Sequence, residues 1–322
     1  MTTPRPLAAP GSLTTPHRVG DPRGLLFGLG AYGLWGVFPA FFTLLAPAGT
    51  VEVLAHRIVW TLLLLAVLLV VIRRLGDLAA ITGRTWLLLA CASALISTNW
   101  LIYIYAVNAN HVVDAALGYF VTPLVSVVLG VAVFAERLNP GQWVALTIAM
   151  AAVLLLSVGL DGPPLIAIGL ALSFGLYGAV KKIVPTDPRV SVAVETAIAA
   201  PFALAYLVVL QLSGSSHFTN HGAGHALLMA LCGPVTAVPL LLFGAAAQRL
   251  PLVTLGLLQY LTPSLQMAWG VLVDHEPMPP VRWAGFALIW AALAIFSTDA
   301  LSRAFGGRRA ARVDRPGNLQ GS

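Results

Sequence analysis

Long apolar stretches separated by short polar connections make up most of this chain. A helix needs about 20 apolar residues to cross the hydrocarbon core of a bilayer, and ten stretches approach that length. Most connections are short and carry Pro, Gly or charge, and the longest, 213–224, is rich in Ser, His and Gly. The pattern predicts ten spanning helices, at about 25–45, 51–72, 85–107, 113–134, 140–159, 163–180, 190–211, 225–247, 252–273 and 281–301.

Both ends of the chain differ from the region between them. Residues 1–20 and 303–322 are polar, contain Pro and Arg and show no periodicity, so we expect two disordered tails. The start of the chain has no short apolar segment followed by a cleavage site, and the first helix is therefore expected to be retained.

Composition excludes a soluble protein. Hydrophobic residues make up 58% of the chain and charged residues 9%, and the mean hydropathy is +0.88. A soluble domain of 322 residues with these values would lack the polar side chains needed to cover its surface. The chain is therefore expected to lie in a bilayer, with membrane lipids around it.

The basic residues provide an independent test of the ten helices. Short loops on the cytoplasmic side of a membrane protein are enriched in Lys and Arg. If the N-terminus is cytoplasmic, 16 of the 18 Lys and Arg residues fall on that side. These 16 are Arg5, Arg18, Arg23, Arg73, Arg74, Arg84, Arg137, Lys181, Lys182, Arg189, Arg249, Arg303, Arg308, Arg309, Arg312 and Arg315. We predict a cell-membrane protein with both termini in the cytoplasm. The net charge of +6 then describes a membrane face, and no nucleic-acid partner is expected.

A faint internal repeat divides the chain into two related halves. Adding 140 to residue numbers after Ala94 pairs Asn108, Thr122-Pro123, Gly130, Glu136, Trp143, Ala151-Ala152 and Ser157 with Gln248, Thr262-Pro263, Gly270, Glu276, Trp283, Ala291-Ala292 and Ser297. Each half would hold five helices. Because five is odd, the second half must enter the membrane inverted, an arrangement that is typical of alternating-access transporters. The predicted fold class is an all-α polytopic membrane protein with ten transmembrane helices as two inverted five-helix repeats.

Several segments resemble one family of membrane proteins. They are Leu54-Ala55-His56-Arg57-Ile58-Val59-Trp60, Asn99-Trp100-Leu101, Ala106-Val107-Asn108, Leu117-Gly118-Tyr119-Phe120, Thr122-Pro123-Leu124, Glu136-Arg137, Phe174-Gly175-Leu176-Tyr177-Gly178, Leu255-Gly256, Gln259-Tyr260 and Ala291-Ala292-Leu293-Ala294-Ile295-Phe296. The chain is similar in these segments to the RarD family of EamA-type transporters, in the drug/metabolite transporter superfamily. The resemblance implies two EamA-like five-helix repeats, at 24–159 and 163–301, in a permease of the inner membrane.

Ionisable residues inside the predicted spans are the first candidates for contacts with a solute. An Arg at the bilayer centre costs about 2.5–3.5 kcal/mol on insertion scales, so such residues usually face a cavity or a partner. Arg57 lies about six residues, or ~9 Å, inside the outer end of the second span, and Glu195 lies at a similar depth from the cytoplasmic end of the seventh. Both are predicted to bind substrate or a coupling ion, with His56 as a further candidate. Snorkelling of Arg57, a helix-end role for Glu195 and packing of His56 are the alternatives.

Polar and aromatic residues at mid-span form a second group of candidates for substrate binding. Asn99 either ties helices together or faces a polar cavity, and aromatic residues either clamp an amphipathic solute or pack between helices. The candidates are Asn99, Trp100, Tyr103, Tyr119, Gln259, Tyr260, Trp35 and Tyr177. Pro123 and Pro263 match across the repeat, and we predict paired helix kinks there.

The sequence contains no motif that favours catalysis or a cofactor. There is no P-loop, and Asp274-His275-Glu276 is more typical of a solvated loop than of a metal site. We expect a secondary transporter that exports a small metabolite or drug-like solute, with coupling to protons as one option and Glu195 as the proton site. A membrane-embedded enzyme acting on a lipid-linked substrate, or a channel, is the alternative. The substrate and the oligomeric state are left open.

Overall fold

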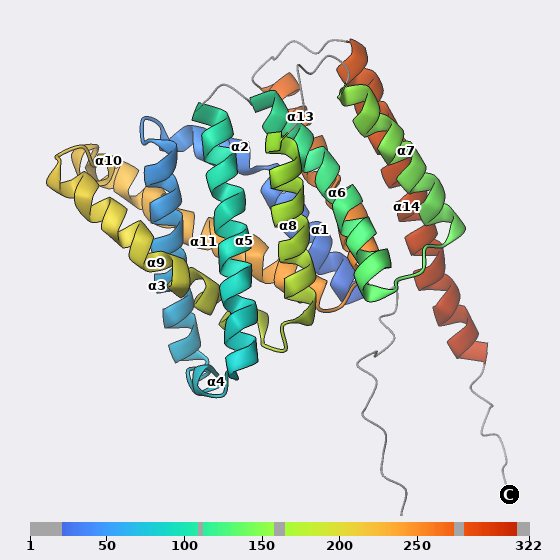
Figure 1. Ribbon diagram of the computed structural model, residues 1–322, viewed down its shortest axis with the longest axis horizontal. Helices are drawn as coiled ribbons and strands as arrows, with labels where there is room; N and C mark the ends of the chain where they lie inside the picture. Colours follow the sequence, from blue (N-terminus) through green and yellow to red (C-terminus); the bar gives the residue numbers. More distant parts are fainter. Residues whose placement is uncertain (1–20, 109–111, 158–164, 274–279, 314–322) are drawn as a thin grey trace, which may run out of the picture.

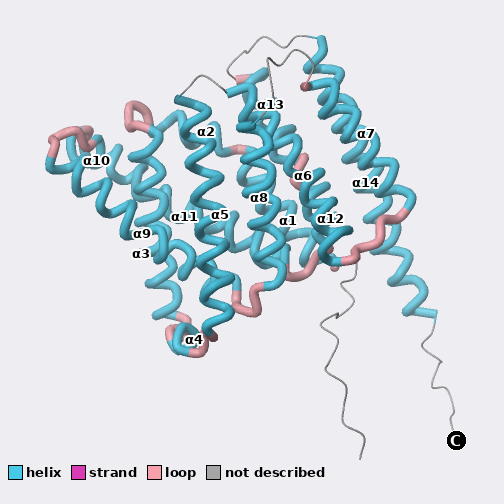
Figure 2. Tube along the Cα trace, viewed as in Figure 1, coloured by secondary structure: helices cyan, strands magenta, loops and turns pink. Residues whose placement is uncertain are grey.

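The computed structural model describes residues 21–108, 112–157, 165–273 and 280–313, and every regular element in these ranges is helical (Figure 1). Most loops and turns lie at the two ends of the bundle (Figure 2). The elements are α1 (Pro22–Gly36), α2 (Phe38–Phe42), the 3-10 helix η1 (Thr43–Leu45), α3 (Thr50–Val71), α4 (Gly76–Ala79), α5 (Gly83–Asn108), α6 (Val112–Phe134), α7 (Pro140–Leu156), α8 (Leu165–Ile183), α9 (Pro188–Leu212), α10 (His217–Asn220), α11 (Gly222–Ala247), α12 (Leu252–Leu258), α13 (Leu261–Leu272) and α14 (Pro280–Val313).

Six of these helices are long and apolar enough to cross a membrane: α3, α5, α6, α8, α9 and α11. The α1 helix and the bent segment after it, which meet at 44°, make a seventh if they count as one span. The α7 helix and the apolar part of α14 are shorter. The predicted all-helical, multi-spanning architecture is therefore confirmed. Each predicted range coincides with a helix or a broken helix, but a total of ten crossings stays a prediction.

Large apolar side chains cover the outside of the bundle. Leu87, Phe202 and Leu212 are 72%, 80% and 83% exposed, and many other Leu and Val residues are exposed on the long helices. In water such a surface would be strongly unfavourable, whereas in a bilayer it contacts lipid chains. The exposed apolar surface therefore supports the multi-pass membrane assignment.

The first predicted span is interrupted at a proline. Pro39 has no N–H to donate to the carbonyl of Trp35 and its ring crowds that carbonyl, so α1 ends at Gly36 and α2 begins in a new direction. The side-chain amide of Gln266 donates to the Trp35 carbonyl at 3.2 Å. A distant helix thus satisfies a backbone group near the break.

The ninth predicted span is also interrupted. The α12 helix ends at Leu258 and α13 begins at Leu261, so Gln259 and Tyr260 lie at the break. Pro263 follows in the first turn of α13 and cannot donate to the carbonyl of Gln259. Pro123, its counterpart in the repeat, lies inside α6, which is continuous through it.

The structure changes two predicted boundaries. The α8 helix runs to Ile183, past the predicted end at 180, so Lys181 and Lys182 are helical residues and not loop charges. The α14 helix continues to Val313, so residues 303–313, predicted to be disordered, form helix. This extension is rich in Ala and Arg, which are among the strongest helix formers. Residues 1–20 and 314–322 lie outside the described residues.

Helices from the first half of the chain pack against helices from the second half. The α3 helix lies against both α9 and α11, α6 lies against α8 and α12, and α7 pairs with α14 at one edge of the bundle (Figure 1). The core is built mainly from Ala, Leu and Val, with Tyr32, Tyr177 and Tyr260 buried in it.

The contact of α3 with α11 depends on the absence of a side chain at Gly233. A Cβ at this position would lie 2.7 Å from the carbonyl oxygen of Trp60. We expect Gly233→Ala to destabilise the purified protein by about 1–3 kcal/mol, since overpacking forces backbone shifts. The control is Gly33→Ala, because a Cβ there meets nothing within 4 Å. Chemical unfolding that leaves both variants equally stable would contradict this account of the packing.

Candidate functional site

A narrow cavity lies among five helices, α3, α5, α8, α9 and α11. Its free space is comparable to a water molecule in this conformation, so a solute can enter only if the helices move apart. The lining combines apolar side chains, hydroxyl groups and two charged residues. The lining residues are Arg57, Ile58, Thr61, Ser93, Ile96, Ser97, Trp100, Tyr177, Val192, Glu195, Thr196, Ala199, Thr236 and Leu240.

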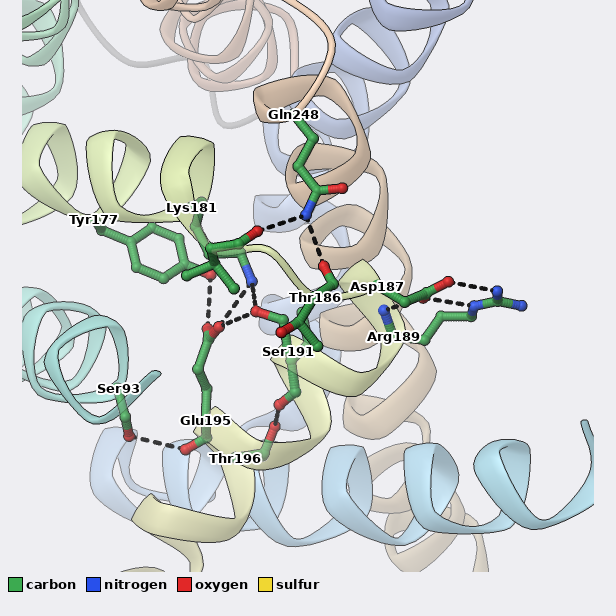
Figure 3. A network of polar contacts seen from close by, with 12 residues as sticks. Ser93, Tyr177, Lys181, Thr186, Asp187, Arg189, Ser191, Glu195, Thr196 and Gln248 are labelled. Carbon is green, nitrogen blue, oxygen red and sulfur yellow. Dashed lines mark hydrogen bonds and ion pairs between the residues drawn. The ribbon is translucent and has the colours of Figure 1, made fainter. Parts of the chain in front are cut away.

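Glu195 is the centre of a buried hydrogen-bond network (Figure 3). Lys181 Nζ lies 2.7 Å from Glu195 Oε1, and Ser191 Oγ donates to the same oxygen at 2.6 Å. The Tyr177 hydroxyl donates to Oε2 at 3.1 Å, and Ser93 Oγ donates to the Glu195 backbone carbonyl at 2.8 Å. The network joins α5, α8 and α9. Every carboxylate oxygen of Glu195 therefore has a protein donor.

The ion pair within this network is almost fully buried, with Lys181 1% and Glu195 4% exposed. Two separate charges at this depth would be costly, but a pair that also has hydrogen bonds is nearly neutral overall. Lys181 was predicted to be a charge on the cytoplasmic side, and its role as the partner of Glu195 was not predicted. Lys181 and Glu195 are 14 residues apart, one near the end of a helix and the other near the start of the next. Because only a short loop joins these helices, the sequence could have suggested that the two side chains meet.

Arg57 also lines the cavity, but it lies on α3, a helix that contributes no side chain to this network. Its Nε donates to Thr236 Oγ1 on α11 at 3.0 Å. The guanidinium carbon lies 5.1 Å from the ring centroid of Trp100, 5.3 Å from that of Phe42 and 5.8 Å from that of Phe38. Cation–π attraction of this kind stabilises a cation that has left water. The side chain of Arg57 thus points into the protein, toward α11 and these rings.

Two aromatic candidates, Trp100 and Tyr177, line the cavity, whereas Trp35 is not among its lining residues. Trp35 packs against Tyr32, Phe174 and Phe243 with ring centroids 5.6–5.8 Å apart. Tyr177 stacks on Phe243 at 5.7 Å while its hydroxyl reaches Glu195. The aromatic cluster therefore holds Tyr177 in place for its hydrogen bond.

Asn99, Tyr103 and Tyr119 lie outside the cavity lining. The Asn99 amide donates to the Leu170 carbonyl and to Ser173 Oγ, both at 3.0 Å, and so ties α5 to α8. The rings of Tyr103 and Tyr119 contact each other at 5.9 Å. For Asn99 the structure favours the helix-tying role over substrate contact.

Gln259 and Tyr260 also lie away from the cavity, at the break between α12 and α13. Both are buried, Gln259 being 5% and Tyr260 0% exposed. The Tyr260 hydroxyl has no hydrogen-bond partner among the described residues. Their position makes them part of the packing around the broken helix.

His56 is turned toward the connection between α9 and α11. It stacks on Phe218 of α10 at 4.8 Å, and its Nδ1 accepts from Trp60 Nε1 at 3.2 Å. One turn earlier, Glu52 accepts the backbone N–H of His217 at 2.8 Å and lies 2.7 Å from its ring Nδ1. These contacts fasten α10 over the N-terminal end of α3. The sequence predicted only a long connection at 213–224, rich in Ser, His and Gly, and this attachment was not predicted.

A second buried ion pair joins the two halves of the chain. Lys182 Nζ lies 3.2 Å from Glu136 Oε1 and donates to the Leu250 carbonyl at 2.8 Å. Glu136 also accepts the backbone N–H groups of Leu252 and Val253 at 2.8 and 2.9 Å. A carboxylate at a helix N-terminus satisfies orphan donors and is favoured by the helix dipole. Glu136 therefore connects the end of α6 to the start of α12.

The short connection before α9 is also fixed in place (Figure 3). Gln248 Nε2 donates to the carbonyls of Thr186 and Val184 at 2.8 and 3.3 Å. Asp187 caps α9 by accepting the Arg189 N–H at 2.9 Å. Hydrogen bonds from Arg189 lower the pKa of Asp187 below its usual value.

The Ser and Thr residues of the cavity were not among the predicted site residues. A spacing of four residues could have found them, because i and i+4 lie on one helix face. The cavity-lining pairs with this spacing are Arg57 with Thr61, Ser93 with Ser97, Ile96 with Trp100, Val192 with Thr196, Glu195 with Ala199 and Thr236 with Leu240. Among the described residues, no group of three or more His, Cys, Asp or Glu side chains could hold a metal ion. The Asp274-His275-Glu276 run lies outside those residues.

A polytopic helical protein, with a small cavity between its two halves that is lined by apolar, hydroxyl and charged side chains, is the class that the fold and site define. The model of the EamA-like transporter family matches this chain twice, over residues 22–158 and 163–298. The chain belongs to the EamA-like transporter family, among its RarD-type members. This confirms the resemblance found in the sequence.

Two relatives and one solved structure are similar over most of the chain. Protein RarD of Streptomyces exfoliatus is 51% identical over 283 residues, which cover 87% of this chain and 90% of the relative. Protein RarD of Escherichia coli (strain K12) is 39% identical over 281 residues, covering 87% and 95%. A crystal structure with 17% identity superimposes with a TM-score of 0.68 over 86% of this chain and 98% of that one. At that identity the superposition shows the fold alone.

The Lys181–Glu195 pair can be tested by removing its members singly and together. We expect Lys181→Met alone to destabilise the purified protein by about 3–5 kcal/mol, because it leaves a buried carboxylate unpaired. Adding Glu195→Leu should restore much of that loss, because no buried charge then remains. Asp77→Asn, which removes the exposed pair with Arg74, is the control and should change stability by at most about 1 kcal/mol. Additive losses in the double variant would show that the two charges do not interact.

Proposed function

We propose that this protein is a secondary transporter that moves a small metabolite or drug-like solute across the cell membrane by alternating access. The observation that carries the proposal is the cavity, where polar and charged side chains from helices of both halves meet inside an apolar bundle. Intramembrane charges that face a cavity usually mark a substrate or ion pathway. Membership of a family of transporters supports the same conclusion.

An inverted repeat of ten helices is supported by the pattern of helix packing. In chain order, α1, α3 and α5 of the first half correspond to α8, α9 and α11 of the second. Exchange of the halves therefore turns the contact of α1 with α11 into that of α8 with α5, and both contacts exist. It likewise turns the α3 contact with α11 into that of α9 with α5. Two further pairs, α3 with α9 and α7 with α14, are each their own counterparts. We infer two repeats, at 24–159 and 163–301, related by a pseudo-twofold axis in the membrane plane.

The position of the cavity supports alternating access. Arg57 lies seven residues after the first residue of α3, and Glu195 lies seven residues after the first residue of α9. At ~1.5 Å per residue, each is about 10 Å inside its helix, measured from opposite membrane faces in the proposed topology. The substrate site is therefore proposed near the middle of the bilayer, reachable from one side at a time.

We further propose that Glu195 couples transport to protons. Protonation of Glu195 would remove the charge that holds Lys181 and so loosen the contact between α8 and α9. A proton can drive transport only if it binds the inward and outward states with different affinity, and a contact that breaks in one state supplies that difference. Export is the direction we assign for testing.

Proton coupling predicts a separation between exchange and accumulation. The solute is first identified by comparing metabolites inside and outside cells with and without the protein, and is then studied in proteoliposomes. Glu195→Gln should keep exchange of solute across the membrane and lose uphill movement driven by a pH gradient. Glu52→Gln removes a buried carboxylate outside the cavity and serves as control. If Glu195→Gln accumulates solute as the parent does, Glu195 has a structural role only. A flux without saturation and counterflow would identify a channel.

The proposed topology places both tails in the cytoplasm and residues 213–224 outside. Single cysteines introduced into either tail, in a background lacking Cys91 and Cys232, should resist an impermeant thiol reagent in intact cells. A cysteine at His221 should react, because this residue lies in the connection between α10 and α11. Reaction at the tails with protection at position 221 would reverse the orientation.

A further inference from the structure

The cavity contains one cation that no carboxylate of the described residues neutralises. Arg57 forms no ion pair within the described part of the chain. The nearby acidic side chains already have partners: Glu52, on the same helix as Arg57, is hydrogen-bonded to His217, and Glu195 on α9 is paired with Lys181. The cavity lining therefore carries a charge of about +1, while its second charged residue belongs to a neutral pair.

The free hydrogen-bonding groups of Arg57 are at the end of its side chain. Nε donates to Thr236, whereas the two terminal nitrogens donate to no side chain or carbonyl among the described residues. The rings of Phe38, Phe42 and Trp100 partly compensate for the loss of water around the guanidinium, but rings accept no conventional hydrogen bond. Several N–H groups of a planar fork thus remain available to a ligand.

A planar fork with a single uncompensated positive charge selects a particular ligand chemistry. Guanidinium binds carboxylates through two parallel hydrogen bonds, and one negative charge balances one positive charge. Apart from Arg57 and Glu195, the lining residues are apolar or hydroxyl-bearing, such as Ile96, Leu240 and Thr61. They suit an uncharged body. A ligand ammonium group would find no free acid, since both oxygens of Glu195 are occupied by Lys181, Ser191 and Tyr177.

We propose that the solute of this transporter is a small organic monocarboxylate with an apolar body, and that its carboxylate binds the terminal nitrogens of Arg57. The proposal rests on the proposed function, because it names the substrate class of the same cavity. It makes Arg57 the specificity-determining residue. Amines and dianions are excluded on charge, and neutral analogues bind weakly because they leave the guanidinium uncompensated.

The test compares probes of one shape and different charge. Binding of phenylacetate, phenylacetamide, 2-phenylethylammonium and phenyl phosphate to the purified full-length protein is measured by calorimetry and thermal shift, together with a series of carboxylates from acetate to indoleacetate. We expect carboxylates to bind and the amide, the ammonium and the phosphate to bind at least about 10-fold more weakly. Arg57→Gln should weaken carboxylate binding by about 10- to 100-fold, the scale of a lost hydrogen bond to a charged group. Arg57→Lys should retain part of the affinity.

Arg249→Gln is the matched control, since Arg249 also lies over an aromatic ring, that of Phe27, but outside the cavity. It should bind carboxylates as the parent does. Failure of every carboxylate to bind, or equal binding by the amide or ammonium, would overturn the proposal. So would carboxylate binding that survives in a folded Arg57→Gln protein. Counterflow of the identified solute tests transport separately: a neutral or cationic solute that still exchanges in Arg57→Gln refutes the anion assignment and leaves the transporter assignment standing.

Discussion

A bilayer offers no water to a polar group, so every charge, amide and hydroxyl inside this bundle needs a partner within the protein. Much of the architecture follows from that requirement. Lys181 and Glu195 are both deep in the bundle because each compensates the other. Asn99 joins α5 to α8 because its amide finds acceptors only on the neighbouring helix. The end of the Arg57 side chain lacks a hydrogen-bond partner among the described residues, and it is the group to which we propose that a solute carboxylate binds.

The apolar pattern of the sequence predicted most of the fold. Helical segments coincide with the predicted spans because a continuous apolar run of that length has few other stable forms. Helix ends were predicted less well. Lys181 was assigned to a loop because charge usually marks the membrane boundary, a rule that fails when a buried partner such as Glu195 is present. Breaks at Val37 and at Gln259 depend on prolines two and four residues further along the chain, and their exact place is set by tertiary contacts.

The candidate site was predicted in part. Arg57 and Glu195 stand out in sequence because charges are rare in apolar segments, and the structure brings both to one cavity. Aromatic residues carry no such signal, since the same ring can line a cavity, as Trp100 does, or fill a core, as Trp35 does. Which of the two occurs depends on helix rotation and on neighbours far along the chain. A single sequence does not contain that information in readable form.

Two consecutive lysines at the end of α8 form ion pairs with different halves of the chain. Lys181 binds Glu195 in the same half of the chain, whereas Lys182 binds Glu136 in the other half and the Leu250 carbonyl. Successive residues on a helix are separated by about 100° of rotation, so the two ammonium groups project in different directions from one rigid element. A turn of α8 about its axis changes both distances at once. A rotation of α8 that broke the Lys181–Glu195 pair would therefore also alter the Lys182–Glu136 pair between the two halves.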